Sequence, residues 1–379
     1  MSTSNECLRV LKLSAVAGLG LKYFHRLYSA FGSINEIYDA TALAMREAGL
    51  AYRVISGVER MRSASIEVVL GDYLDTLLEW EQGRDDRYVL CLEDALYPSL
   101  LREISCPPPI VYVEGQLETF LQPAIAVVGS RKSTLKGIQH AQSLSAALAK
   151  HGCCVTSGLA LGIDAAAHRG ALQAQGLTCG VLATGLDLVY PRQHQALAEQ
   201  VKSSGLLLSE MKLGTKPVPG NFPRRNRLIS GMSHGVLVVE AGLKSGSLIT
   251  AKYALEQNRE IFAIPGSIDS LVSKGCHALI KQGAKLVENI DDILEEFSEM
   301  SCVPNIEAVA AGLSVVASLS VDEKLLMEKM GHDLISFDEL ISVTGLNTMQ
   351  LSQFLIELEL KRLVALVPGG YQRMNTVKL

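Results

Sequence analysis

We predict an α/β protein built on an extended, Rossmann-like sheet that is doubly wound and mostly parallel, with a small helical N-terminal domain and a C-terminal winged-helix domain. Three observations predict this class. Apolar strand-like runs alternate with helical stretches in the middle of the chain, the 379 residues exceed one ordinary core, and both flanks carry helical patterns. The expected domains span residues 1–80, 85–295 and 320–379.

The first eighty residues contain a glycine-rich turn between two helical patterns, Val16-Ala-Gly18-Leu-Gly20. The residues that follow it are apolar at helical spacing: Phe24, Leu27, Tyr28 and Phe31. This arrangement is typical of a helix-hairpin-helix, whose backbone N–H groups can point at a phosphate, and Lys22, His25 and Arg26 lie close by in sequence. Glycines also cap helices, so DNA contact and plain packing are both open, and packing is favoured.

The central part alternates strand and helix. Strands are expected at residues 124–128, 153–157, 178–183, 206–209, 235–240 and 260–264. Helices are expected between them at residues 137–150, 161–175, 192–202 and 247–257. Ligands of such sheets bind outside the carboxyl ends of the strands, so one crevice is expected to collect the loops that follow them.

The first of these strands ends in Gly129-Ser130-Arg131, as a nucleotide-binding turn begins. The glycine permits a tight turn, and the N–H groups at the start of the next helix would face an anion. Neither GxGxxG nor GxxxxGK[ST] is completed, which disfavours dehydrogenases and P-loop NTPases. Arg131 would crowd a dinucleotide, yet it could itself hold a phosphate.

A second basic segment reads Pro217-Val-Pro-Gly-Asn-Phe222-Pro-Arg-Arg-Asn-Arg227 and is predicted to be a shaped loop between two strands, because proline continues neither a helix nor a central strand. Residues 211–239 hold five basic residues and no acidic one, although the chain has a net charge of −5. Bases stack on aromatic rings and guanidinium groups pair with phosphates, so a nucleic-acid strand is the leading ligand. A solvated loop with Phe222 in the core is the alternative.

The composition of the chain restricts the cellular compartment and the kinds of site that the protein can have. The eight cysteines form no CxxC pair and several lie in apolar strands, which indicates a reducing compartment and disfavours a metal site. Nothing resembles a signal peptide, and no run of eighteen uncharged apolar residues supports a membrane span. With a pI near 6.0, affinity for nucleic acid must come from local patches.

Beyond about residue 295 the composition predicts a linker, followed from residue 320 by a small domain. Ser336 is expected to cap a helix, with Asp338 and Glu339 in its first turn, and Gly345 and Asn347 to make the turn to a second helix. The apolar face of that helix is predicted to be Leu351, Phe354, Leu355 and Leu358, and two strands are expected around residues 368–370. Its exposed positions are polar or acidic, so a protein contact is favoured over duplex reading.

Several ordered motifs together carry a family resemblance. They are Gly129-Ser130-Arg131, Ser157-Gly158-Leu-Ala-Leu-Gly162-Ile-Asp164 with His168, Phe222-Pro-Arg-Arg-Asn-Arg227, Val239-Glu240-Ala241 and Ser245-Gly-Ser-Leu-Ile-Thr-Ala251. In this combination, over residues 85–290, the chain resembles the DNA processing protein A (DprA/Smf) family. A SAM-like or helix-hairpin-helix module and a winged helix on the flanks fit that resemblance.

The resemblance implies a cytoplasmic bacterial protein that binds single-stranded DNA, protects it during natural transformation in competence, and loads the RecA recombinase as a mediator of DNA recombination. It also implies a homodimer formed through the α/β domain. No bond would be made or broken, and neither a cofactor nor a metal is expected.

The predicted DNA-binding set is Gly129, Ser130, Arg131, Ser157, Gly158, Lys216, Phe222, Arg224, Arg225, Asn226, Arg227, Gly246 and Ser247. In it, Arg131 is expected to hold a phosphate, Phe222 to stack near a base, and the amide of Asn226 to fix the loop. His194 and His277 stand where many relatives have Asn, which leaves the detail of those two loops open.

An enzymatic alternative is a Rossmann-like nucleotide hydrolase of the phosphoribohydrolase type. Asp164 and His168 lie one helical turn apart and could form an acid/base pair, with Glu240 near a strand end. A structural role for both is favoured, because Asp164 near a helix start complements the dipole and His168 can bond a neighbouring loop. A dinucleotide-dependent reductase is weaker still, since the second and third fingerprint glycines are missing.

Overall fold

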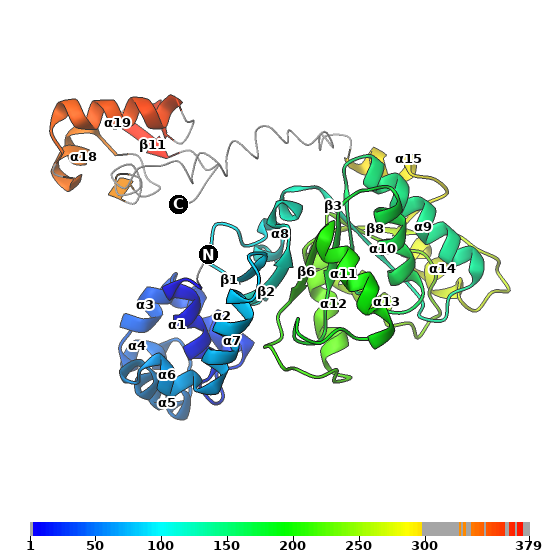
Figure 1. The fold of residues 1–379 in the computed structure, drawn as a ribbon, viewed down its shortest axis with the longest axis horizontal. Helices are drawn as coiled ribbons and strands as arrows, with labels where there is room; N and C mark the ends of the chain where they lie inside the picture. The colour runs from blue at the N-terminus through cyan, green and yellow to red at the C-terminus, as the bar shows by residue number, and fades with distance from the viewer. Residues whose placement is uncertain are drawn as a thin grey trace. The chain divides into compact units, whose positions relative to one another are not determined.

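The computed structural model describes residues 3–297, 326, 329–330, 335–344, 346–360, 364–367 and 370–373. The chain forms two compact units, Met1–Val303 and Pro304–Leu379 (Figure 1). The first unit contains both the helical N-terminal part and the sheet. The division of this unit into two separate domains therefore stays a prediction.

One sheet of nine strands forms the centre of the first unit, in the order β1-β2-β6-β5-β4-β3-β7-β8-β9. The strands from β6 to β9 in this order are parallel, while β1 and β2 add an antiparallel edge. The bounds are β1 Arg87–Cys91, β2 Ile110–Gly115, β3 Ala124–Val128, β4 Cys154–Ser157, β5 Thr178–Val181, β6 Gly205–Ser209, β7 Gly235–Val238, β8 Glu260–Ala263 and β9 Lys285–Leu286. The doubly wound, mostly parallel sheet is thus confirmed.

The helices at the predicted places are α9 Leu135–Lys150, α10 Ile163–Gln173, η2 Arg192–His194 with α11 Gln195–Ser203, and α13 Ser247–Glu256. The structure adds α8 Ser99–Arg102, η1 Leu117–Leu121, α12 Asn221–Gly231, α14 Lys274–Lys281, α15 Asp291–Leu294 and η3 Glu295–Phe297. Within the described residues, no helix is both long enough and apolar enough to pass through a membrane. No disulfide forms among the cysteines of that part of the chain.

Both faces of the sheet are covered. Along β3, Ile125 and Val127 pack with α9 and α10 in one core, while Ala126 and Val128 pack with α12 and α13 in another. Successive strand residues point to opposite faces, so a strand buried on both faces must be apolar throughout. This explains the uninterrupted apolar runs in the sequence.

The N-terminal part is helical, with α1 Asn5–Ser14, α2 Leu21–Phe31, α3 Ile34–Asp39, α4 Ala42–Glu47, α5 Tyr52–Ser63, α6 Ile66–Leu70 and α7 Asp72–Gln82. The turn between α1 and α2 is a glycine hairpin, in which Gly18 adopts φ +88° and Val16 and Leu19 are buried. The helical core continues into the face of β1, β2 and β6. His25, predicted near a phosphate, instead bonds the Pro107 carbonyl at 2.6 Å.

The Pro/Arg segment departs from its prediction, because α12 begins at Asn221 and the arginines lie on a helix and not on a loop. Pro217 and Pro219 precede the helix, and Pro223 occupies its first turn. Backbone N–H groups of a first helical turn have no partner within the helix, so proline costs little there. The loop prediction is therefore wrong from Asn221 onward.

The second unit contains α18 Phe337–Thr344, α19 Thr348–Leu360 and a hairpin of β10 Val364–Val367 with β11 Gly370–Arg373. The Ser336 hydroxyl accepts from the N–H of Glu339, whose carboxylate accepts from Ser336, so the predicted capping box is confirmed. Leu351, Leu355 and Leu358 are buried as predicted. The predicted linker begins within η3, where Phe297 is buried, and residues 298–325, Gly345 and residues 368–369 lie outside the described residues.

Candidate nucleic-acid interface

A cleft of about 650 Å3 opens at the carboxyl ends of the parallel strands. It lies where β3 and β7 are neighbours, which is the point where the chain switches from one half of the sheet to the other. The predicted residues that line it are Gly129, Ser130, Arg131, Phe222, Arg225, Asn226, Gly246 and Ser247. Lys216, Arg224, Arg227, Ser157 and Gly158 do not line it.

The aromatic part of the cleft is a cluster of three side chains from three different loops or helices. The Arg131 guanidinium lies 5.2 Å from the centre of the Phe222 ring, and the Tyr190 ring lies 5.7 Å from the same ring at an angle of 57°. Phe222 is half-buried and Tyr190 is 46% exposed. Phe222 is therefore not a core residue, and its ring is available at the cleft.

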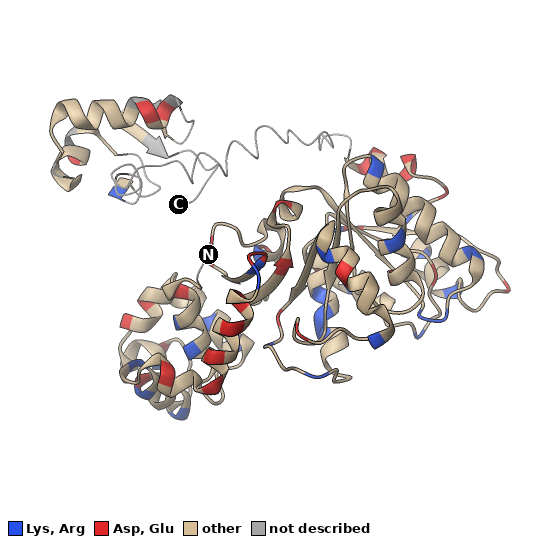
Figure 2. Ribbon diagram, in the orientation of Figure 1, with Lys and Arg blue, Asp and Glu red and all other residues tan. Residues whose placement is uncertain are grey.

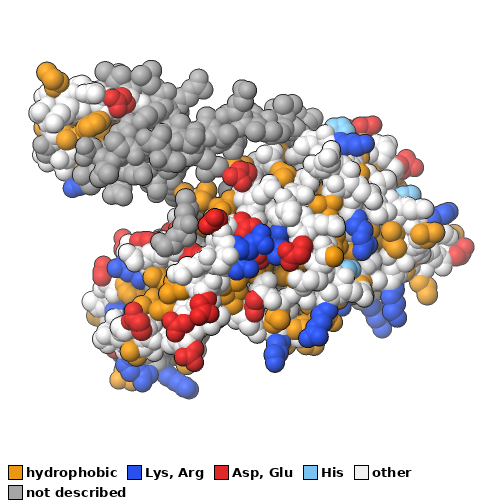
Figure 3. Space-filling model, viewed as in Figure 1, with side chains coloured by type: hydrophobic (Ala, Val, Ile, Leu, Met, Phe, Trp, Pro, Cys, Tyr) orange, Lys and Arg blue, Asp and Glu red, His pale blue; other side chains and the backbone are white. Residues whose placement is uncertain are grey.

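Two exposed cations line this cleft, Arg131 and Lys132, and a third exposed cation, Lys216, precedes the lining residue Pro219 by three positions in the chain. Across the described part of the chain, none of the three forms an ion pair with a carboxylate. Figure 2 shows that α12 carries further basic residues, and Figure 3 shows separate basic groups, with no continuous basic field, on the face in view.

Arg224 and Arg227 are not free cations. Glu210 lies one residue before the acid-free stretch that predicted a basic loop. Its carboxylate forms ion pairs with Arg224, at 3.0 Å from Nε, and with Nη2 of Arg227. Arg227 is buried and also donates to the Cys106 carbonyl at 2.6 Å. The expectation that both line the cleft as phosphate ligands is corrected, because one carboxylate balances much of their charge.

Arg225 reaches the cleft wall but is buried. Its guanidinium donates to the carbonyls of Gly158, at 2.7 Å, and Val181, and to the amide oxygen of Asn226. Burial lowers the pKa of Arg225 to about 10, while Asp164 opposes that change. A Cβ on Gly158 would lie 2.6 Å from the guanidinium carbon, so this glycine makes room for the arginine.

Ser157 and Gly158 therefore support the cleft from within. Ser157 is fully buried and its hydroxyl donates to the Val127 carbonyl at 2.7 Å. Direct DNA contact, predicted for both residues, is not possible in this arrangement because neither reaches the surface.

The start of α9 is also occupied. The Glu240 carboxylate accepts from the N–H of Thr134 at 2.8 Å and from its hydroxyl at 2.5 Å. A carboxylate already satisfies this helix start, so the prediction that its N–H groups face a ligand is wrong. Gly129 is needed for close approach, since a Cβ there would lie 2.6 Å from Ile163.

The start of α13 is more open. A Cβ on Gly246 would meet no atom within 4 Å, so the chain leaves free space above this turn. The amide of Asn226 donates to the Gly246 carbonyl at 3.2 Å and so links α12 to the turn before α13. This is not the loop that Asn226 was expected to fix, because Asn226 itself lies on a helix. Ser247 is buried beside Ser245, with 2.8 Å between the hydroxyl oxygens.

Asp164 and His168 do not present an acid/base pair to the cleft. The Asp164 carboxylate accepts from the N–H groups of Gly158 and Ala160, and burial raises its pKa although Arg225 opposes the change. His168 is fully buried and bonds Thr178 at 2.7 Å. Burial lowers the pKa of His168 to about 3. Both residues have the structural role that the sequence favoured.

Among the cleft residues that the predicted DNA-binding set left out, Tyr190 and Lys132 supply an aromatic ring and a cation. Tyr190 follows an irregular stretch after β5, and the feature of the sequence that could have indicated it is an aromatic residue next to Pro191. Lys132 directly follows the Gly129-Ser130-Arg131 turn. His194 bonds the Leu159 carbonyl at 2.8 Å and His277 bonds that of Gly266 at 3.0 Å. The two histidines therefore hold loops, as an amide could.

One cluster in the described residues could hold a metal ion, formed by Cys7, Cys91 and Asp94 between α1 and β1. The Cys7 thiol donates to Asp94 at 3.1 Å, and the N–H of Cys91 donates to the same carboxylate at 2.6 Å. These bonds satisfy the groups without an ion. The cluster lies apart from the cleft, with none of its residues in the cleft lining.

The fold and the cleft define an extended Rossmann-like protein with a helical N-terminal part and a winged-helix segment. A family model described as DNA recombination-mediator protein A matches residues 88–298, and a DprA winged helix domain model matches residues 314–370. The chain belongs to the DNA recombination-mediator protein A family.

Two relatives are similar to this chain in sequence over long alignments. Protein Smf of Synechocystis sp. is 35% identical over 96% of this chain and 98% of its own length. DNA processing protein DprA of Streptococcus pneumoniae is 44% identical over 54% of this chain and 72% of its own.

Two solved structures are also similar. The X-ray structure of the Streptococcus pneumoniae protein has a TM-score of 0.66 and 34% identity, and it covers 78% of this chain and 99% of that chain. DNA processing protein A of Helicobacter pylori, described with its single-stranded DNA binding mode, has a TM-score of 0.51 and 30% identity, over 56% of this chain and 96% of that one.

Proposed function

We propose that this protein binds single-stranded DNA in the switch-point cleft, as a mediator that protects incoming DNA and loads RecA during natural transformation. The observation that carries the proposal is the half-buried Phe222 ring with the unpaired Arg131 guanidinium over it at 5.2 Å. A ring offers a surface for a base, and an adjacent cation offers a partner for the phosphate of the same nucleotide.

The cleft favours a single strand over a duplex. In a duplex each base face is already stacked on its neighbours, so Phe222 and Tyr190 could contact only the edge of the helix. Unpaired bases can enter a cleft of about 650 Å3 one at a time while their phosphates remain at the exposed cations Arg131, Lys132 and Lys216. The open space above Gly246 leaves room for the strand to continue.

The direct test is binding of a fluorescent 20-nucleotide strand and of the matching duplex to the full chain across a salt series. Three unpaired cations predict a slope of log affinity against log salt of about −2, using ~0.7 per phosphate on a single strand. Preference for the single strand with this slope is expected. Equal affinity for the duplex, or affinity that does not change with salt, would contradict the proposal.

RecA loading and dimerisation are the finer parts of the proposal. The family membership supports both, and exposed apolar side chains on the loops after β7 and β8, Leu243, Ile268 and Leu271, supply surface that another protein chain could cover. Cysteines that form no disulfide in the described residues fit a cytoplasmic protein. Faster RecA assembly on a strand precoated with single-strand-binding protein, and a dimer mass by sedimentation, are the expected results.

No catalytic step is proposed. Asp164 lines the cleft, but its carboxylate is buried and held by two backbone N–H groups, and the fully buried His168 does not line the cleft, so the two cannot act as an acid/base pair on a bound nucleotide. Incubation with nucleoside monophosphates is expected to release no free base, and measurable release would favour the hydrolase alternative.

A further inference from the structure

The helical N-terminal part contains one short motif twice, at residues 17–22 and 48–53. The first copy is Ala-Gly-Leu-Gly-Leu-Lys and the second is Ala-Gly-Leu-Ala-Tyr-Arg. The glycine of each copy adopts a positive φ, +88° at Gly18 and +82° at Gly49, and the leucine that follows it is buried. Glycine adopts such a conformation without strain, so both copies form the same tight turn.

The helices around the two turns repeat as well. α1 and α2 enclose the first turn, α4 and α5 enclose the second, and α3 joins the two pairs. This part of the chain is therefore a tandem of two helix-hairpin-helix units, of which the sequence predicted only the first.

The two units pack against each other with approximate two-fold symmetry. Arg26 of the first unit donates to the carbonyl of Gly49, in the second turn, at 3.1 Å. Gly57 stands in the second unit where Arg26 stands in the first. A Cβ on Gly57 would lie 2.7 Å from the side chain of Val16, in the first turn. Each hairpin thus contacts the equivalent part of the other unit, as the two halves of an isologous interface do.

The two hairpins carry equivalent cations. Lys22 and Arg53 are each the last residue of the motif and the second residue of a helix, and both are exposed. In the described part of the chain, neither side chain forms an ion pair with a carboxylate. Arg46 adds a third exposed cation, and Glu47 is the single acidic residue within residues 15–22 and 46–53.

Acidic groups that could balance this charge lie elsewhere in the helical part. Neither α2 nor α5 has an acidic residue in its first turn or a side chain that caps it, whereas α1, α3 and α6 each have a serine cap and a glutamate. α7 carries Asp72, Asp75, Glu79 and Glu81 (Figure 2). The hairpins therefore present more positive than negative charge to solvent.

Hollows beside the first turn extend this surface. One, of about 270 Å3, lies between residues 15–17 and α5, where Arg53 and Arg60 line it. Another, of about 720 Å3, is lined by Gly18, Gly20 and Lys22 and also by residues of α12. Other residues of α12 line the DNA cleft. The hairpins and the DNA cleft therefore have α12 as a common border.

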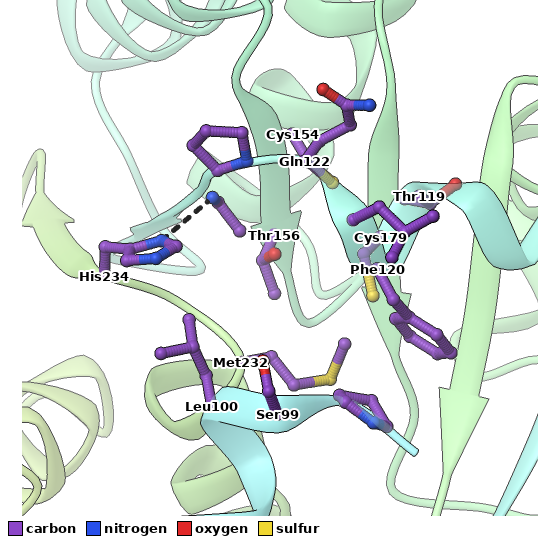
Figure 4. Close-up of a pocket in the computed structure, with 14 residues that line it drawn as sticks. Ser99, Leu100, Thr119, Phe120, Gln122, Cys154, Thr156, Cys179, Met232 and His234 are labelled. Atoms are coloured by element: carbon purple, nitrogen blue, oxygen red, sulfur yellow. Dashed lines mark hydrogen bonds between the residues drawn. The ribbon is translucent and has the colours of Figure 1, made fainter. Parts of the chain in front are cut away.

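A separate cavity of about 320 Å3 lies at the amino ends of β3, β4 and β5 (Figure 4). Among its described lining residues there is no Lys, Arg, Asp or Glu. A polyanion would find no counter-charge there. The hairpins are therefore the stronger candidate for a second contact with DNA.

We propose that residues 15–22 and 46–53 form a second DNA-binding surface, which holds phosphates of duplex DNA, one strand at each hairpin. Equivalent exposed cations without ion pairs support the proposal, as do two units whose symmetry matches that of two antiparallel strands. This hairpin surface is separate from the DNA cleft and does not depend on the proposed function.

The test is fluorescence anisotropy of the full chain with a labelled blunt duplex of 20 base pairs across a salt series. Two cations predict a slope of log affinity against log salt of about −2, using ~0.9 per phosphate on B-DNA. The duplex is expected to bind more weakly than a single strand, because its base faces cannot stack on protein rings. Absence of duplex binding at low salt would overturn the proposal.

Lys22→Ala and Arg53→Ala should each bring the duplex slope closer to zero by about 0.9, and the double variant should lose about tenfold or more in duplex affinity. Affinity for single-stranded DNA and Tm should stay the same. Lys150→Ala is the matched control, and Phe222→Ala should also leave duplex binding unchanged, so a failure of the cleft and a failure of the hairpin surface are distinguishable. Unchanged duplex affinity in the double variant would overturn the proposal.

Gly20→Asp should weaken duplex binding without weakening the fold. Gly20 precedes α2 with an ordinary extended backbone, and a Cβ there would meet no atom within 4 Å. Asp is favoured at this cap position, so Tm should not fall. Its carboxylate would bond the N–H groups at the helix start and repel a phosphate, so duplex affinity should fall by about fivefold or more. Gly20→Asn caps without the charge and should lose less affinity. Full duplex affinity in Gly20→Asp would overturn the proposal.

Discussion

At the level of single residues, Arg131 and Phe222 are expected to contribute to DNA binding in different ways, one through charge and the other through stacking. The guanidinium lies over the ring, so one side chain pair offers both a phosphate partner and a base partner. Arg131 is exposed and forms no ion pair in the described residues, whereas Phe222 also contacts Tyr190. Removing the two side chains should therefore have different effects on the salt dependence of binding.

For Arg131→Ala we expect weaker binding of single-stranded DNA and a salt slope closer to zero by about 0.7, because one phosphate contact is lost. Tm should change little, since Arg131 forms no ion pair in the described residues and is the last of the groups that favour the charged form of Asp164. Lys150→Ala is the matched control, with an exposed cation at the far end of α9. A large drop in Tm for Arg131→Ala would identify a structural arginine.

Phe222→Ala should cost about 1 to 3 kcal/mol of affinity for the single strand and leave the salt slope unchanged, because it removes stacking and no charge. Phe222→Trp keeps an aromatic face and should retain affinity. Since Phe222 is half-buried, the stability loss should remain below the ~3 to 5 kcal/mol typical of a buried Phe. Full affinity in Phe222→Ala would remove this ring from the site.

Arg225 is expected to act on stability and not on the salt slope. Arg225→Ala leaves Asp164 buried without its cation and two carbonyls without a donor, so the free energy of unfolding should fall by about 3 to 5 kcal/mol in urea. Arg224→Ala is the control, since Arg224 is 51% exposed and Arg227 still pairs with Glu210. That change should cost no more than about 1 kcal/mol. A stable Arg225→Ala protein with a flatter salt slope would restore Arg225 as a phosphate ligand.

His168 makes stability depend on pH. Its folded-state pKa of about 3 lies below the ordinary value of 6.5, mainly because burial disfavours the charged ring. A depressed pKa contributes stability that is present above pH 6.5 and lost as the pH falls toward 3, by as much as ~1.4 kcal/mol per pH unit. Urea melts from pH 7 to 4 should show this loss, and His168→Asn should reduce it. An identical pH dependence in both proteins would contradict the burial argument.

At the level of elements, the sequence predicted the six strands β3 to β8 and the helices α9, α10, α11 and α13, because burial on both faces of the sheet leaves apolar runs in the central strands. It did not predict β1, β2, β9 or α12. The prolines suggested a loop, but Pro217 and Pro219 lie before the helix and Pro223 falls in its first turn, where a missing N–H is harmless. Proline is common both in loops and in the first turn of a helix, so the prolines alone could not distinguish the two.

The sequence predicted those site residues whose role follows from their own residue type. It did not predict the roles of residues that depend on a partner from another element of the fold. Gly129, Arg131, Phe222 and Asn226 all line the cleft as expected. Arg224 and Arg227 looked free because Glu210 stands just outside the segment, and its proximity to both arises only when β6 and α12 pack. Burial of Arg225 beneath Gly158 is likewise a tertiary property that spacing in the sequence does not show.

At the level of the whole molecule, a chain with a net charge of −5 must bind an anionic strand through a small region. Both the cleft and its unpaired cations lie within the first compact unit. The described part of α19 in the second unit exposes Gln353 and Glu359, which are not phosphate ligands. The second unit is therefore not expected to contribute to binding of the single strand.

A protein that ends at Val303 should accordingly bind single-stranded DNA within about twofold of the full chain and with the same salt slope, because no counted phosphate contact is removed. Fluorescence anisotropy of both proteins with one labelled strand, together with a thermal melt of each, is the measurement. The melt matters because a truncation that unfolds the first unit would lose binding for a trivial reason. Loss of more than tenfold in affinity by a truncated protein that melts normally would place DNA contacts in the winged-helix segment, and the cleft alone would then be an incomplete site.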